Sequence, residues 1–188
     1  MRVIDKLVGS LEALAKGKNI AIAGAAYAAL AMILSRGGAR LEEIAGSGCI
    51  LDLRKHFTEA EAFAVLSQYG DEGRRLYIRL ALVDTIYPLA YGALFSLVLA
   101  FLLPRAFSPT SPLRKLALLP ALAVGMDYLE NAGLITMTVT FPERWPRLGM
   151  AAGLFNAAKW TIVATCFALA AAGLLGWGVQ TLRRRREA

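Results

Sequence analysis

Four long apolar blocks run through the chain, and they limit the class of structure it can adopt. They cover residues 19–35, 78–103, 116–141 and 148–179. A helix needs roughly 17–25 predominantly apolar residues to cross the hydrocarbon core of a bilayer, and each block is long enough. Hydrophobic residues make up 57% of the sequence, against roughly 45–50% in a soluble domain. We therefore predict an all-α integral membrane protein, a bundle of four transmembrane helices forming a single domain.

The N-terminal residues 1–18 have the pattern of a basic amphipathic helix. Apolar residues recur there at helical spacing along one face, and an arginine and three lysines flank that face. A helix of this kind lies in the membrane interface with its apolar side toward the acyl chains. We predict an interfacial helix; the alternative is an ordinary helix packed against the rest of the protein.

A polar segment, residues 36–77, separates the first two blocks. Thr58 and Glu61 within it have the T-x-x-E spacing of a capping box, and Gly70 is a typical helix stop. These signals predict a short helix outside the hydrocarbon. Asp71 is then expected to cap the helix that leads into the second block.

Lysine and arginine occur without matching acids in the connection between the second and third blocks and in most of the tail at 180–188, and they are in excess in the N-terminal segment. Residues 36–77 also carry arginines and a lysine, but seven acids balance them there. The positive-inside rule places the connection, the tail and the N-terminal segment on the cytoplasmic side, so both termini are predicted inside and residues 36–77 outside. The Arg- and Ala-rich composition favours a bacterial inner membrane. Since most of the net charge of +7 is explained by topology, no nucleic-acid partner is predicted.

Polar side chains interrupt the apolar blocks at helical spacing. They are Asp84, Tyr87 and Tyr91 in the second block, Asp127, Tyr128, Glu130 and Asn131 in the third, and Asn156 and Lys159 in the fourth. At about 1.5 Å per residue, these faces reach a common level between the outer end and the middle of the bilayer. A charged side chain in hydrocarbon costs at least about 2.5–3.5 kcal/mol, so the three faces should turn inward and meet.

The charges in this predicted layer do not balance. Asp84, Asp127 and Glu130 face a single ammonium group, that of Lys159. In a low dielectric the surplus carboxylates must either keep a proton or meet a cation or cationic ligand. We predict Asp84, Asp127, Glu130 and Lys159 as catalytic residues. The residues expected to contact a ligand are Tyr87, Tyr91, Tyr128, Asn131 and Asn156.

Such a layer predicts a pocket for a membrane lipid or another amphiphilic ligand, bound and modified by proton transfer. Two alternatives stay open. One is a proton- or cation-linked transporter, and the other is a structural subunit, acting as a homo-oligomer or with partner membrane subunits, whose polar layer only cross-links helices. No cofactor or metal is predicted, because the single His56 cannot form a zinc site. Coordination of Mg²⁺ or Ca²⁺ by Asp84, Asp127 and Glu130 is the remaining metal alternative.

Overall fold

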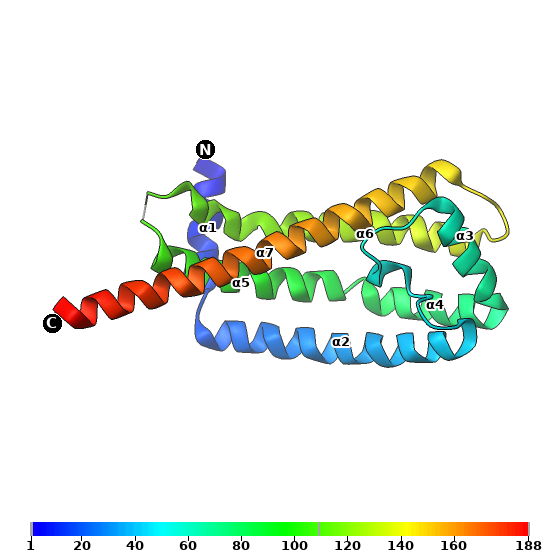
Figure 1. The fold of residues 1–188 in the computed structure, drawn as a ribbon, viewed down its shortest axis with the longest axis horizontal. Coiled ribbons are helices and arrows are strands. Elements are labelled where there is room, and N and C mark those ends of the chain that lie inside the picture. Colours follow the sequence, from blue (N-terminus) through cyan, green and yellow to red (C-terminus); the bar gives the residue numbers. More distant parts are fainter. Residues whose placement is uncertain (1, 109, 188) are drawn as a thin grey trace.

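The computed structural model describes residues 2–108 and 110–187, and every regular element in those residues is helical (Figure 1). The elements in chain order are α1 (Arg2–Leu14), α2 (Gly17–Ala45), the 3-10 helix η1 (Leu51–Leu53), α3 (Glu59–Gln68), α4 (Gly70–Asp84), α5 (Tyr87–Ala106), the 3-10 helix η2 (Pro112–Leu118), α6 (Leu119–Val139) and α7 (Pro146–Glu187). The all-α prediction is confirmed.

Within the described residues, three helical stretches are long and apolar enough to cross a membrane, judged by length and composition. They are Gly17–Ala45, Gly70–Ala106 and Pro146–Arg183, and they contain the first, second and fourth predicted blocks. The third block forms α6, in which acids and an amide lower the hydropathy. The structure therefore supports a membrane protein with at least these three stretches.

Helix α5 lies at the centre of the bundle. It packs against α2, α6 and α7, while α6 and α7 pack along each other as antiparallel neighbours, as their tight connection predicts. None of the most apolar part of α2 is buried inside the protein, whereas 44% of that of Gly70–Ala106 is. The apolar surface of α2 is thus available to lipid, and α5 serves as core.

Helices α3 and α4 are joined by a sharp reversal at the end of the bundle away from the termini (Figure 1). The predicted capping box is confirmed: Glu61 N–H donates to Thr58 Oγ1 at 3.2 Å, and Thr58 N–H donates to Glu61 Oε2 at 2.7 Å. The predicted N-cap role of Asp71 is wrong. Helix α4 already begins at Gly70, whose φ of +56° makes the reversal, so Asp71 falls inside the first turn.

Helix α1 runs across the opposite end of the bundle (Figure 1). Its Val8 is buried, whereas Val3 on the same helix is 71% exposed. Two ion pairs fix α1 to η2: Lys115 Nζ lies 2.8 Å from Asp5 Oδ1, and Arg114 pairs with Glu12. The predicted N-terminal helix is present and docked on one side, and its exposed residues include Val3, Ile4 and Leu7 beside Asp5 and Lys6.

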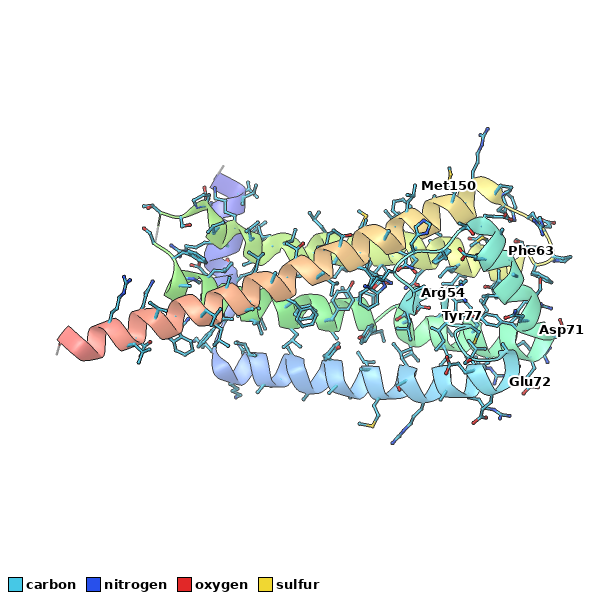
Figure 2. All side chains as sticks on the ribbon, viewed as in Figure 1. Arg54, Phe63, Asp71, Glu72, Tyr77 and Met150 are labelled. Carbon is cyan, nitrogen blue, oxygen red and sulfur yellow. The ribbon has the colours of Figure 1, made fainter. Side chains whose placement is uncertain are left out.

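Two apolar cores occupy the two ends of the bundle. The core beside α3 includes Leu41, Phe57, Leu66, Tyr69, Tyr77 and Leu134. Figure 2 labels Phe63 and Tyr77 at this end. The core beside α1 includes Ala15, Leu99, Ala100, Leu103, Ala117 and Cys166. Along α6 and α7 the predicted polar residues fall between these cores, which places the polar layer inside the bundle.

Candidate functional site

The centre of the polar layer is an ion-pair cluster between α6 and α7. Lys159 Nζ lies 2.6 Å from Glu130 Oε2 and 3.6 Å from Asp127 Oδ1. Glu130 is fully buried, and the exposed fractions of Asp127 and Lys159 are 4% and 7%. The two acids are three residues apart on α6, so they lie on one face and one ammonium group can contact both. The predicted convergence of these three charges is found.

Hydrogen bonds extend this cluster to α4 and α5. Tyr91 Oη donates to Asp127 Oδ2 at 3.0 Å. Asn131 Nδ2 donates to Asp84 Oδ2 at 2.6 Å and to Asp127 Oδ1 at 3.3 Å. Four helices therefore contribute to one continuous polar network, in which every link crosses between helices or bridges one turn of α6.

Asp84 is the last residue of α4, and the helix is interrupted directly after it at residues 85–86. Pro88, in the first turn of α5, has no N–H to continue the hydrogen-bond pattern of α4. Tyr128 Oη donates to the carbonyl of Thr85 at 2.7 Å, which satisfies one backbone group freed by the interruption. Tyr128 is 36% exposed and lines neither cavity described below, so it is separated from the network.

The segment between α2 and α3, residues 46–58, here called the α2–α3 segment, folds back over the polar layer. Trp160 Nε1 donates to the carbonyl of Asp52 at 3.0 Å, and Asn156 Nδ2 donates to the carbonyls of Leu51 at 3.3 Å and Arg54 at 2.9 Å. Gly153 lets the segment pass, because a Cβ there would lie 2.0 Å from the carbonyl oxygen of Phe57. Asn156, predicted to contact a ligand, holds the backbone of this segment through its Nδ2.

Asp52 is the acid of this site that the sequence interpretation missed. Its Oδ1 is buried and has no hydrogen-bond partner among the described residues, and its side chain borders both cavities. Sequence reasoning treated Asp52 as one of several solvated acids in a polar segment. The signal that could have found it is the short apolar run Cys49-Ile50-Leu51 and Leu53 around a single acid, since such a run in a polar segment indicates burial.

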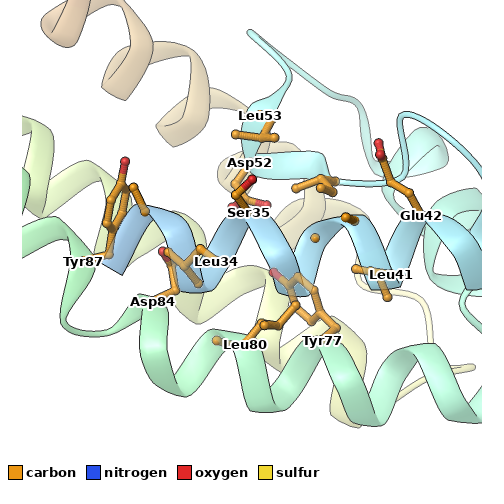
Figure 3. Close-up of a pocket in the computed structure, with 15 residues that line it drawn as sticks. Leu34, Ser35, Leu41, Glu42, Asp52, Leu53, Tyr77, Leu80, Asp84 and Tyr87 are labelled. Carbon is orange, nitrogen blue, oxygen red and sulfur yellow. The ribbon is translucent and has the colours of Figure 1, made fainter. Parts of the chain in front are cut away.

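Two adjoining cavities lie beside the network. The first, about 380 Å³, is lined by α2, α4, Tyr87 of α5 and the α2–α3 segment, and Figure 3 shows its lining. The second, about 270 Å³, is lined by residues of α2, α5, α6 and α7. Four residues line both: Asp52, Leu53, Asp84 and Tyr87. Asp52 of the α2–α3 segment and Asp84 of α4 therefore lie where the two cavities meet.

A row of aromatic rings forms one wall of the second cavity. Successive ring centroids are 5.5 Å apart for Tyr27 and Tyr87, 5.6 Å for Tyr87 and Tyr91, 6.2 Å for Tyr91 and Phe95, and 5.0 Å for Phe95 and Phe167. Asp127, Lys159 and Trp160 complete the polar side of the same cavity. Its lining thus combines aromatic faces with ionisable groups.

The structure brings most of the predicted site residues together. Asp84, Tyr91, Asp127, Glu130, Asn131 and Lys159 form the network, and Tyr87 borders both cavities. Within residues 2–108 and 110–187, no group of three or more His, Cys, Asp or Glu side chains is arranged to hold a metal ion. Comparison of the chain with models of protein families, with curated proteins and with solved structures finds no match.

Proposed function

We propose that this protein binds a membrane lipid or another amphiphile in the two adjoining cavities beside its polar network. The observation that carries the proposal is the pair of cavities, about 380 and 270 Å³, that meet at Asp52 and Asp84. Ligand pockets in proteins usually measure about 300–1,000 Å³ and combine apolar walls with a few polar groups. Cross-linking of helices alone requires no such space.

The proposed membrane arrangement has four spans, in which α6 is added to the three stretches described above. Helix α6 packs against α5 and α7, and its acids face Lys159 and Tyr91 rather than lipid, so its lower hydropathy is compatible with a membrane interior. Helix α1, which runs across the bundle end and exposes Val3 and Leu7, is proposed to lie in the interface (Figure 1).

The proposed orientation places both termini on the cytoplasmic side of a bacterial inner membrane. Arg105, Arg114, Lys115 and the chain's Arg-rich tail belong to the bundle end that carries α1. An excess of Lys and Arg is typical of the cytoplasmic side. The cavities then lie toward the outer leaflet.

The depth of the cavities suits a ligand with a polar head and an apolar tail. The apolar parts of α2 and α4 are limited on the outer side by Arg36 and Arg79. Asp84 lies about 8 Å deeper than Arg79 along the helix. The head group would lie near Asp52 and Asp84, and the tail would extend along the second cavity toward Phe167, between α2 and α7.

Two features favour ligand binding over transport and define where chemistry would occur. A closely packed core lies between these two cavities and the α1 end of the bundle, where a separate pocket of about 190 Å³ is lined by Pro104, Arg105, Trp177, Gln180 and Thr181. Among the acids predicted to be catalytic, Asp84 borders both cavities, whereas Glu130 lines neither. We therefore assign proton transfer to a bound ligand, in this proposal, to Asp84.

The proposal is tested by the lipids that co-purify with the protein. Full-length protein is extracted in detergent, and bound molecules are identified by mass spectrometry. Val163 lines the second cavity, so Val163→Phe should remove the co-purifying amphiphile, while Ala164→Phe, one residue along on the exposed face of α7, should leave it bound. If neither variant changes what co-purifies, or nothing co-purifies with the unaltered protein, ligand binding in this cavity is excluded.

A further inference from the structure

Acidic groups outnumber cations along the second cavity. Asp52, Asp84 and Asp127 border it together with one cation, Lys159. That cation is already engaged, since its Nζ contacts Glu130 Oε2 at 2.6 Å and Asp127 Oδ1 at 3.6 Å. The cavity therefore presents carboxyl groups that Lys159 does not neutralise.

Two buried carboxyl oxygens in this region have neither a hydrogen bond nor an ion-pair contact among the described residues, whereas Glu130 Oε2, which also lacks a hydrogen bond, contacts Lys159. One is Oδ1 of Asp52, at the junction of the cavities, and the other is Oε1 of Glu130, whose side chain is fully buried. A buried acceptor without a partner costs about 1–3 kcal/mol, and more when it is charged. A donor or cation placed at the junction would remove this cost for Asp52.

The aromatic wall provides a second, independent feature that suits a cation. Tyr27, Tyr87, Tyr91 and Trp160 line the same cavity as the acids. The negative face of an aromatic ring attracts an organic cation by about 0.5–2 kcal/mol, depending on how far the site is desolvated, and aromatic cages are known recognition sites for quaternary ammonium groups. An anionic head group would instead meet the acidic side chains of Asp52 and Asp84, while Lys159 is already paired with Asp127 and Glu130.

We propose that the occupant of these cavities is a cationic amphiphile with an alkylammonium head group. The head lies between Asp52 and Asp84 against the ring of Tyr87, and the alkyl tail lies along Phe95, Val163 and Phe167. This inference rests on the proposed function and specifies its ligand class. The organic cation is preferred over a metal ion because aromatic side chains make up half of the lining of the second cavity, and the described residues hold no group of ligands arranged around a metal ion.

The test compares three probes that share a dodecyl chain: dodecyltrimethylammonium, dodecanoate and uncharged dodecanol. Each is titrated into full-length protein in dodecyl maltoside micelles, and binding is followed by the emission of Trp160 in a Trp145→Phe/Trp177→Phe background. Trp160 lines the cavity, whereas Trp145 and Trp177 do not. We expect the ammonium probe to bind about tenfold more tightly than either other probe, a difference of about 1.4 kcal/mol.

Variants then locate the selectivity. Asp52→Asn should weaken binding of the ammonium probe by roughly five- to tenfold and leave dodecanol unchanged. Glu43→Gln is the matched control, since Glu43 is exposed, pairs with Arg40 and borders neither cavity. Tyr27→Leu should weaken the ammonium probe by about threefold without altering any charge. If Asp52→Asn does not give folded protein by circular dichroism, Tyr27→Leu decides the matter alone.

The outcomes separate this inference from the function on which it rests. Equal binding of all three probes, or a preference for dodecanoate, overturns the cationic ligand and leaves amphiphile binding intact. Failure of all three probes to shift Trp160 emission overturns both. Selective binding of the ammonium probe that is lost in Asp52→Asn or Tyr27→Leu supports the inference.

Discussion

The apolar core next to α1 and the polar layer on its α3 side, here called the packed half and the polar half, differ in what fills the space between their helices. A second apolar core lies beyond the polar layer, beside α3. In the packed half, Leu99, Leu103 and Ala117 have exposed fractions of 0–1% and pack with α7 without charged groups. In the polar half, a network of ionisable side chains and two cavities separate α2 from α7. The same four long helices therefore form a dry core at one level and a polar, partly hollow interior at the next.

The difference begins with the side chains on α7. A Cβ at Gly176 would lie 2.9 Å from the Cβ of Ala106, so the glycine allows α7 to approach α5 closely in the packed half. In the other half, Lys159 holds α7 to α6, and Trp160 holds it to the α2–α3 segment. Close packing needs only small and apolar residues, whereas the polar half depends on specific partners. Local departures from an apolar core of this kind are expected at functional sites.

The largest loss of unfolding free energy is expected for a substitution of Lys159. Lys159→Met removes the cation that contacts two buried acids, and we expect a loss of about 3–5 kcal/mol in unfolding free energy. Unfolding by denaturant titration in detergent micelles gives the measurement, with the exposed Lys55→Met as control. Adding Glu130→Gln to Lys159→Met should recover part of the loss. A mild effect, close to that of the control, would mean that the cluster is not a stability element.

Truncating an apolar side chain should cost more unfolding free energy in the packed half than in the polar half. Leu103 is fully buried, and Leu103→Ala is expected to cost about 2–5 kcal/mol because a cavity would be left in a dry core. Val163 already borders a cavity, so Val163→Ala should cost about 1 kcal/mol or less. The same denaturant titration compares the two. Equal costs at both positions would break the distinction between a dense half and a hollow half.

An intermediate loss of stability is expected where Asn156 of α7 holds the α2–α3 segment. Asn156→Leu removes two hydrogen bonds to the carbonyls of Leu51 and Arg54, at a cost of about 1–3 kcal/mol. Hydrogen exchange should increase across residues 50–55 while the amides around Leu103 keep their protection. Asn131→Leu, which instead interrupts the network below, provides a comparison. If the segment stays protected in Asn156→Leu, then Trp160 alone is sufficient to hold it.

Sequence reasoning was successful for features that depend on helical periodicity. Three of the apolar blocks, the short helix after Thr58, and the inward convergence of Asp127, Glu130 and Lys159 follow from spacing along single helices. A buried face recurs every three or four residues wherever the rest of the chain goes, so these features are encoded locally.

What sequence reasoning missed depends on contacts between distant segments. The burial of Asp52 requires hydrogen bonds from Asn156 and Trp160, more than a hundred residues later in the chain. The interruption after Asp84 lies inside one apolar block, and only Pro88 indicates it. Tyr128 is adjacent to Asp127 in sequence, but it points to another side of α6. Each of these is a tertiary contact that overrides a local pattern.

The smallest effect is expected outside both halves, at the cap of α3. Hydrogen bonds from the backbone N–H and the hydroxyl of Thr58 lower the pKa of Glu61 below its usual value. Because the folded pKa lies below the unfolded one, this stabilisation is present at neutral pH and is lost as the pH falls through the folded pKa. Hydrogen exchange of the α3 amides, measured as a function of pH, should therefore show weaker protection in acid. Glu61→Gln, which can still accept the backbone hydrogen bond, should remove the pH dependence, and Glu143→Gln should not. If the pH dependence persists in Glu61→Gln, it would be assigned to the buried acids. The polar half would then control the stability of α3.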